Sequence, residues 1–133
     1  MKITICGSMH FFDKIIALKK TLEELGHSVE TPDREGLDTD YSKLSDQEQI
    51  DLKQKFIDGH IEKIKRSDAV IIANYPKNGR ENYIGANSFL EMGIAYTLGK
   101  KIFLLHNIPD QENSVEIRGL KPSALGGDMS RLN

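Results

Sequence analysis

The apolar run Ala69–Ala73 constrains this chain more than any other feature, because it holds five residues without a polar side chain. A strand with one solvated face alternates apolar and polar residues. An uninterrupted apolar run is instead typical of a strand that is buried on both faces of a parallel sheet. Sheets of that kind are covered by helices on both sides. We therefore expect an α/β architecture with this run at its centre.

Strand and helix patterns alternate along the rest of the chain. Ile3–Cys6 and Ile102–Leu105 are further strand candidates, and a short strand surrounds Val29. Apolar residues at helical spacing predict helices over residues 12–26, 45–66 and 86–98. Strands that alternate with helices of this length favour parallel pairing through crossover connections, with Ile3–Cys6 beside Ala69–Ala73.

The predicted fold class is therefore α/β: one domain over residues 1–133, a flavodoxin- or Rossmann-like three-layer sandwich with a four- or five-stranded parallel sheet. Residues 31–44 are polar and irregular, and their length suggests a lid or binding loop. The tail over residues 115–133 is ambiguous, with a helical turn near Ile117 and an edge strand near Ala124 as its best interpretation.

Composition excludes several classes of protein. Twenty acidic against eighteen basic side chains give a net charge of −2, so no broad positive field is available to bind nucleic acid. No apolar run approaches the roughly 20 residues of a membrane span, and no signal-peptide pattern precedes the first strand, so we expect a cytoplasmic protein. Cys6 is the only cysteine, and the four histidines lack metal-ligand spacing. We expect no metal and no cofactor.

Ligands of open parallel sheets bind outside the carboxyl ends of the strands, and two loops of this chain are candidates for that place. The first holds Gly7, Ser8, Met9 and His10, where a glycine and a helix start can offer backbone amides to an anion. A plain strand-to-helix turn with Ser8 as its cap explains these residues equally well.

The second loop leads into the most informative segment. Between Asn82 and Gly99 the only charged side chain is Glu91, among apolar neighbours. A carboxylate at a helix start that faces the ligand crevice is a usual catalytic group. Ser88 and Glu91 also have the spacing of a capping box, in which Glu91 would merely cap its own helix. Both interpretations stay open at this point.

Three other side chains have a simpler interpretation. The strand position of Cys6 favours a small core residue, and no basic partner for its thiol is evident. Lys77 and Arg80 fit a solvated loop, although they are near enough in sequence to Glu91 to meet a phosphate.

Several motifs together resemble one known family. They are Cys6-Gly7-Ser8 after the first strand, Ser67–Ile71, Phe89–Tyr96 followed by Gly99–Ile102, and Ser114 upstream of Ile117-Arg118-Gly119. The chain resembles the nucleoside 2-deoxyribosyltransferase superfamily and, within it, the 2′-deoxynucleoside 5′-phosphate N-hydrolases. The match covers most of residues 1–119, and the Glu-x-Gly-x-Ala helix is its most specific part.

The resemblance implies a function and a set of residues. Glu91 would be the nucleophile that attacks the anomeric carbon of a nucleoside or nucleoside 5′-monophosphate and forms a covalent glycosyl ester. Amide dipoles at its helix start would keep the carboxylate ionised. Ser8 and neighbouring amides would hold a 5′-phosphate, and Ser114 would reach the same site from the partner subunit of a homodimer. We add Asn87 and Ser88 as candidate substrate-binding residues.

The sequence departs from the family pattern at two positions that help to orient the nucleophile or protonate the leaving base. Thr4 stands where the family commonly has a tyrosine, and His60 stands where it has an aspartate. A histidine can replace the aspartate as a general acid, since a free imidazole titrates near pH 6.5.

The leading prediction is cleavage or transfer of an N-glycosidic bond through Glu91 and His60. The alternative is a non-catalytic nucleotide-binding or sensor module of the same fold, which Thr4 and His60 favour. A third possibility is a structural dimerisation domain in which Glu91 only caps its helix.

Overall fold

The computed structural model describes residues 1–132, and Asn133 lies outside them. Its sheet has five parallel strands in the order β2-β1-β3-β4-β5. The strands are β1 (Lys2–Cys6), β2 (Ser28–Glu30), β3 (Ala69–Ile72), β4 (Lys101–Leu104) and β5 (Ser123–Ala124). The predicted α/β class and parallel sheet are confirmed, and β1 lies directly beside β3 as expected.

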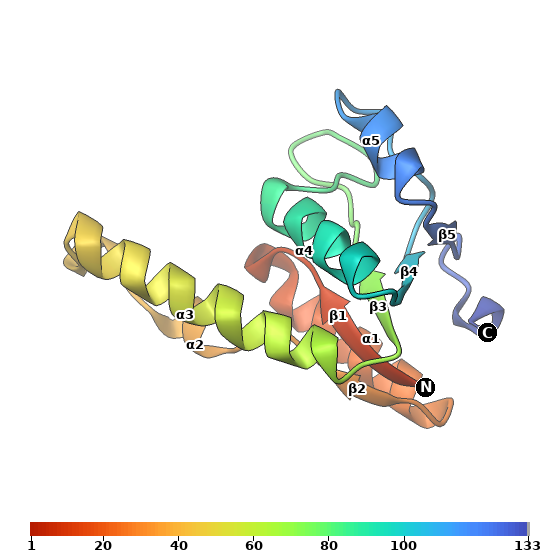
Figure 1. Ribbon diagram of the computed structural model, residues 1–133, viewed down its shortest axis with the longest axis horizontal. Coiled ribbons are helices and arrows are strands. Elements are labelled where there is room, and N and C mark those ends of the chain that lie inside the picture. The colour runs from red at the N-terminus through yellow and green to blue at the C-terminus, as the bar shows by residue number, and fades with distance from the viewer. Residues whose placement is uncertain (133) are drawn as a thin grey trace.

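Helices cover both faces of this sheet, which makes the three layers visible in Figure 1. The helices are α1 (Phe12–Glu24), α2 (Glu35–Asp38), α3 (Asp46–Lys65), α4 (Ala86–Thr97) and α5 (Ser114–Gly119). One apolar core joins α1 to one face of the sheet, and a second joins α3, α4 and α5 to the other. None of these described helices has both the length and the apolar character that a membrane span needs.

The pleat of β1 decides which of its side chains face the site. Successive strand residues point to opposite faces. Ile3 and Ile5 pack in the core on the α1 side, and Cys6 packs in the core on the side of α3 and α4. Cys6 therefore lies under the two helices that carry His60 and Glu91.

Two of the weaker sequence interpretations can now be compared with the structure. Residues 31–44 are not irregular throughout, because they contain α2 and a short 3-10 turn over Tyr41–Lys43. In the tail, α5 covers the helical turn expected near Ile117, and β5 is a short edge strand that includes Ala124.

Candidate active site

A cleft of about 760 Å³ opens at the carboxyl ends of β1 and β3, where ligands of parallel sheets are expected. Its walls are the turn after β1, the segment from Pro32 to Tyr41, the middle of α3, and the loop that leads into α4. The N-terminal half of α3 extends beyond the sheet on one side of it (Figure 1). The cleft brings together Gly7, Ser8, Met9, His60, Asn87, Ser88 and Glu91.

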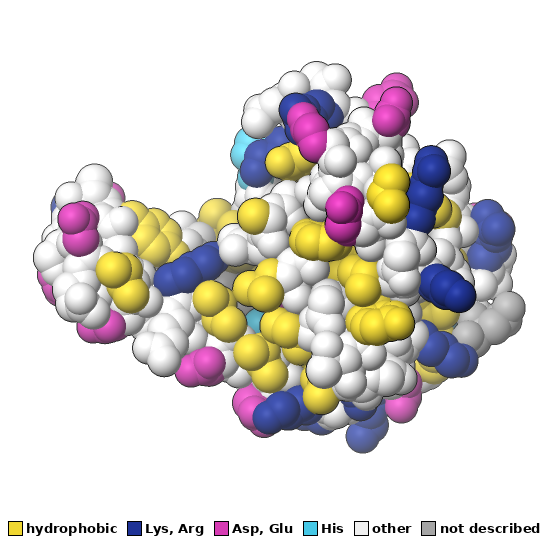
Figure 2. Space-filling view, turned by 45° about the horizontal axis from the view of Figure 1, so that its top comes forward, with side chains coloured by type: hydrophobic (Ala, Val, Ile, Leu, Met, Phe, Trp, Pro, Cys, Tyr) yellow, Lys and Arg dark blue, Asp and Glu magenta, His cyan; other side chains and the backbone are white. Residues whose placement is uncertain are grey.

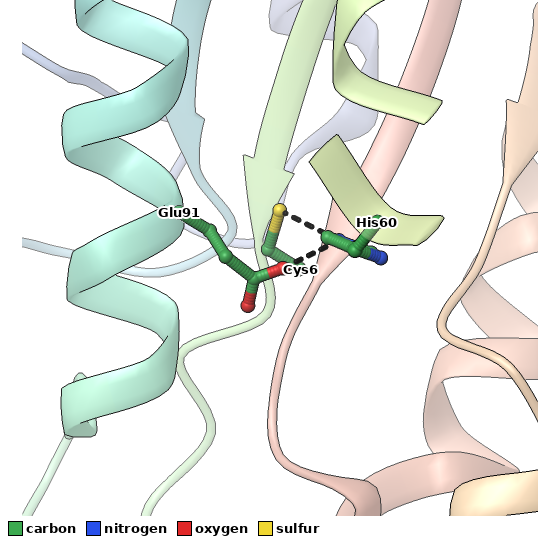
Figure 3. A group of neighbouring side chains, drawn as sticks. All are labelled: Cys6, His60 and Glu91. Atoms are coloured by element: carbon green, nitrogen blue, oxygen red, sulfur yellow. Dashed lines mark hydrogen bonds and ion pairs between the residues drawn. The ribbon is translucent and has the colours of Figure 1, made fainter. Parts of the chain in front are cut away.

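Glu91 and His60 form the closest polar contact in the cleft. Glu91 Oε2 lies 2.6 Å from His60 Nε2, and the two side chains are only 18% and 11% exposed. Figure 3 shows Glu91 reaching from α4 toward the ring of His60 on α3, with Cys6 beside them. The contact fixes one carboxylate oxygen by a charge-assisted hydrogen bond inside a partly desolvated site.

The capping interpretation of Glu91 is wrong. The helix α4 begins at Ala86 with Gly85 as its N-cap residue, so Ser88 is its third residue and cannot be the cap. The carboxylate instead contacts a different helix. Glu91 is the sixth residue of α4, beyond the first turn, where the field of the amide dipoles has fallen off. The main electrostatic interaction of the Glu91 carboxylate is therefore with His60 and not with the amide dipoles at the start of α4.

Cys6 has a basic partner that the sequence did not reveal. Its Sγ atom lies 3.4 Å from His60 Nε2. Burial raises the pKa of the Cys6 thiol well above its usual range, and the nearby carboxylate of Glu91 raises it further. In the protein alone this sulfur therefore carries its proton near neutral pH.

Ser8 lies at the mouth of the cleft and is held in place by two donors. Its hydroxyl oxygen accepts a hydrogen bond from the backbone amide of His10 and another from Lys77 Nζ, each 3.2 Å long. The turn approaches the end of β3 closely at Gly7, where a Cβ atom would lie 3.1 Å from both Ala73 Cβ and Ile15 Cδ1. A side chain at this position would push these two neighbours apart by a few tenths of an ångström, so glycine favours the close approach.

Lys77 is the functional candidate that the sequence analysis placed in a solvated loop. Its backbone exchanges two hydrogen bonds with that of Arg80, of 2.9 and 3.0 Å, around Asn78 and Gly79 with positive φ. This is the geometry of a tight hairpin turn, for which Asn-Gly is the strongest local sequence signal. That dipeptide could have shown that Lys77 is held in a defined place. Arg80 pairs with Glu112 instead.

The cleft is lined by more cations than anions, although the whole chain is slightly acidic. The lysines that line it are Lys53, Lys55, Lys63 and Lys77. Against them stand the carboxylates of Asp33 and Glu91. A cleft with this balance attracts an anionic ligand.

Three residues named from the sequence lie elsewhere. His10 is exposed and does not line the cleft, and Ser114 begins α5 outside it. Thr4 is fully buried, and its hydroxyl lies 2.6 Å from that of Ser67. The position at which the family resemblance expects a tyrosine therefore contributes no group to this cleft.

Comparison with solved structures supports the family resemblance that the motifs indicated. No family model matches the chain, and no curated protein matches it. Among solved structures, it is similar to the CMP N-glycosidase BcmB of Clostridium botulinum, with 25% identity and a TM-score of 0.53, covering 93% of this chain and 84% of that one. This neighbour belongs to the nucleoside 2-deoxyribosyltransferase-like superfamily. The predicted family resemblance is confirmed. A 2-deoxyribosyltransferase from Bacillus psychrosaccharolyticus shares the superfamily fold, with 23% identity, 78% and 71% coverage and a TM-score of 0.51.

Proposed function

We propose that the protein cleaves or transfers the N-glycosidic bond of a nucleoside or nucleoside 5′-monophosphate, with Glu91 as the nucleophile. The observation that carries this proposal is the contact of 2.6 Å between Glu91 and His60 inside the cleft. It occurs in a chain whose structural neighbours are a nucleotide N-glycosidase and a deoxyribosyltransferase.

The proposed reaction has two steps. A carboxylate oxygen of Glu91 forms a bond to the anomeric carbon while the C–N bond breaks, and the base leaves with the bonding electrons and takes up a proton. His60 lines the same cleft and is the proposed donor of that proton. Water then attacks the glycosyl ester and gives the free sugar, or a second base attacks it and gives a new nucleoside.

The test is a panel of nucleosides and nucleoside 5′-monophosphates, in ribose and deoxyribose forms, incubated with the protein and analysed for free base. Addition of a second base to each reaction separates transfer from hydrolysis, because only a transferase joins that base to the sugar and makes the new nucleoside or nucleoside monophosphate. We expect base release from at least one of these substrates. Release from none would refute the proposal.

A sensor function is the second candidate, and the placement of Thr4 favours it. Because the Thr4 hydroxyl is paired with Ser67, no side chain from that position orients the nucleophile. A sensor would bind a nucleotide in the same panel, as measured by calorimetry, and would release no base from it.

We further propose that Ser8 and Lys77 bind the 5′-phosphate. Lys77→Met removes the cation beside the Ser8 hydroxyl. The KM for a nucleoside monophosphate should then rise roughly 10- to 100-fold, which corresponds to the loss of one charge-assisted hydrogen bond. The kcat should change little. The KM for the corresponding nucleoside, which lacks the phosphate, should stay the same. Lys20→Met, an exposed lysine on α1, is the matched control. An equal effect on both substrates would contradict the assignment.

The active form is proposed to be a homodimer. The family resemblance gives Ser114 a role at the site, and Ser114 does not line the cleft of its own chain, so that role would require a second copy. Figure 2 shows apolar side chains gathered on the face that carries α3 and α4, and Leu90 and Tyr96 of α4 are 48% and 56% exposed. Sedimentation at micromolar concentration should give a dimer, and a monomer with full activity would rule the proposal out.

A further inference from the structure

The residues Cys6, His60 and Glu91 form a cluster of three side chains with zinc-ligand chemistry. The thiol sulfur, the imidazole Nε2 and a carboxylate oxygen all lie within 4.8 Å of one another. Thiolate, imidazole and carboxylate are the three ligand types that zinc takes in proteins. Sequence spacing cannot reveal this cluster, because its three residues come from separate elements, β1, α3 and α4.

The distances within the cluster are close to those of a metal site. With Zn–S bonds of about 2.3 Å and Zn–N or Zn–O bonds of about 2.0–2.1 Å, a tetrahedral ion separates sulfur from nitrogen by about 3.6 Å and nitrogen from oxygen by about 3.3 Å. The sulfur of Cys6 is 3.4 Å from Nε2 of His60. The oxygen of Glu91 is 2.6 Å from Nε2, so a rotation of this long side chain must widen that contact by about 0.7 Å.

The scaffold and the charges of the ligand groups themselves suit a divalent cation, although lysines elsewhere in the cleft favour anions. Cys6 is fully buried at the end of a central strand, and His60 and Glu91 lie on two helices that contact each other across it. Figure 3 shows Cys6 and Glu91 on the same side of the His60 ring, so that their ligand atoms converge. A thiolate and a carboxylate together neutralise the two charges of Zn²⁺. His60 and Glu91 also line the cleft, which leaves room for a water molecule as fourth ligand.

We propose that Cys6, His60 and Glu91 bind one Zn²⁺ ion in this cleft. This departs from the expectation, drawn from sequence spacing, that the chain has no metal site. On binding, the S–H bond of Cys6 breaks and its proton leaves to the solvent, while new bonds form from zinc to sulfur, Nε2 and the carboxylate oxygen. His60 binds through Nε2, so the Nε2–H bond that faces Glu91 breaks and that proton passes to solvent while Nδ1 keeps or takes up one, which leaves the imidazole neutral. The proposal goes beyond the glycosidase reaction and does not depend on it, but zinc would occupy the same Glu91 and His60 atoms that this reaction needs, so the zinc-bound protein should release no base.

The test uses the whole protein without nucleotide. Titration with Co²⁺, a spectroscopic substitute for zinc, should produce the near-ultraviolet band of a cobalt–thiolate bond at one ion per chain, and Zn²⁺ should abolish it by displacing cobalt. Cys6 is the only cysteine, so the band can come from no other residue. Competition with a chromogenic chelator then measures the zinc affinity, and release of the thiol proton is measured in weak buffer.

Variants decide whether the other two ligands take part. His60→Gln and Glu91→Gln should each weaken zinc binding by at least about 100-fold, more than the loss of a residue that only supports a ligand. His27→Gln is the matched control. It removes an imidazole that lies outside the cluster, with its Nδ1 3.0 Å from the terminal amine, and it should leave the affinity unchanged.

Two results would overturn the proposal: no cobalt–thiolate band in the wild type, or zinc affinity in His60→Gln and Glu91→Gln equal to that of the wild type. The wild-type spectrum and its reversal by EDTA need no variant, so the test holds even if a substitution prevents folding.

Discussion

Replacing Glu91 by glutamine should abolish base release from every substrate that the wild type accepts. The amide has nearly the same shape as the carboxylate but cannot form a glycosyl ester, so turnover should fall by at least about a thousandfold. Folding should change little, because the glutamine can still hydrogen bond to His60 across the contact of 2.6 Å. The measurement is single-turnover base release by chromatography, together with a thermal melt of each protein.

Glu62→Gln is the control for this change. Glu62 is an exposed glutamate on α3 that pairs with Lys65 at 3.1 Å, so the same chemical change is made outside the cleft. It should keep wild-type turnover. Mass spectrometry of the wild type, quenched during turnover, should find the sugar attached to the peptide that contains Glu91. Retained turnover in Glu91→Gln would end the assignment of this residue as the nucleophile.

The fold was predictable because its determinants are local. The apolar run at Ala69–Ala73 is typical of a strand that is covered on both faces. In the structure it is buried and lies in the middle of the sheet. The boundaries of the helices follow equally local signals, such as the capping box of Ser45 and Glu48, in which both hydrogen bonds are present. Gly26, with a φ of 94°, lies just beyond the end of α1.

The site was predictable only in part, because its contacts are long-range. The isolated charge of Glu91 and the strand-end position of Ser8 both pointed to residues that line the cleft, and their roles there stay predictions. No spacing rule connects Glu91 to His60, which lies 31 positions away on another helix, so only the family resemblance pointed to His60. For the same reason the capping box with Ser88 was a reasonable local alternative that the tertiary contact overrides.

The contact between His60 and Glu91 is compatible with two roles for the histidine, a general acid or a residue that orients the carboxylate. If His60 is the general acid, His60→Gln should slow base release by roughly 10²- to 10⁴-fold, the usual contribution of acid catalysis. If it only orients the carboxylate, the loss should be the same for every leaving group. A substrate whose leaving group needs no proton distinguishes these cases.

A 4-nitrophenyl glycoside of the same sugar phosphate is such a substrate, because 4-nitrophenolate leaves without protonation. We expect His60→Gln to cleave it nearly as fast as the wild type does, while failing with the natural base. His60→Asp supplies the carboxylic acid that the family resemblance implies at this position, and it should recover part of the activity on the natural base. An equal loss on both substrates would make His60 a positioning residue for Glu91, held in that role by the contact of 2.6 Å between them.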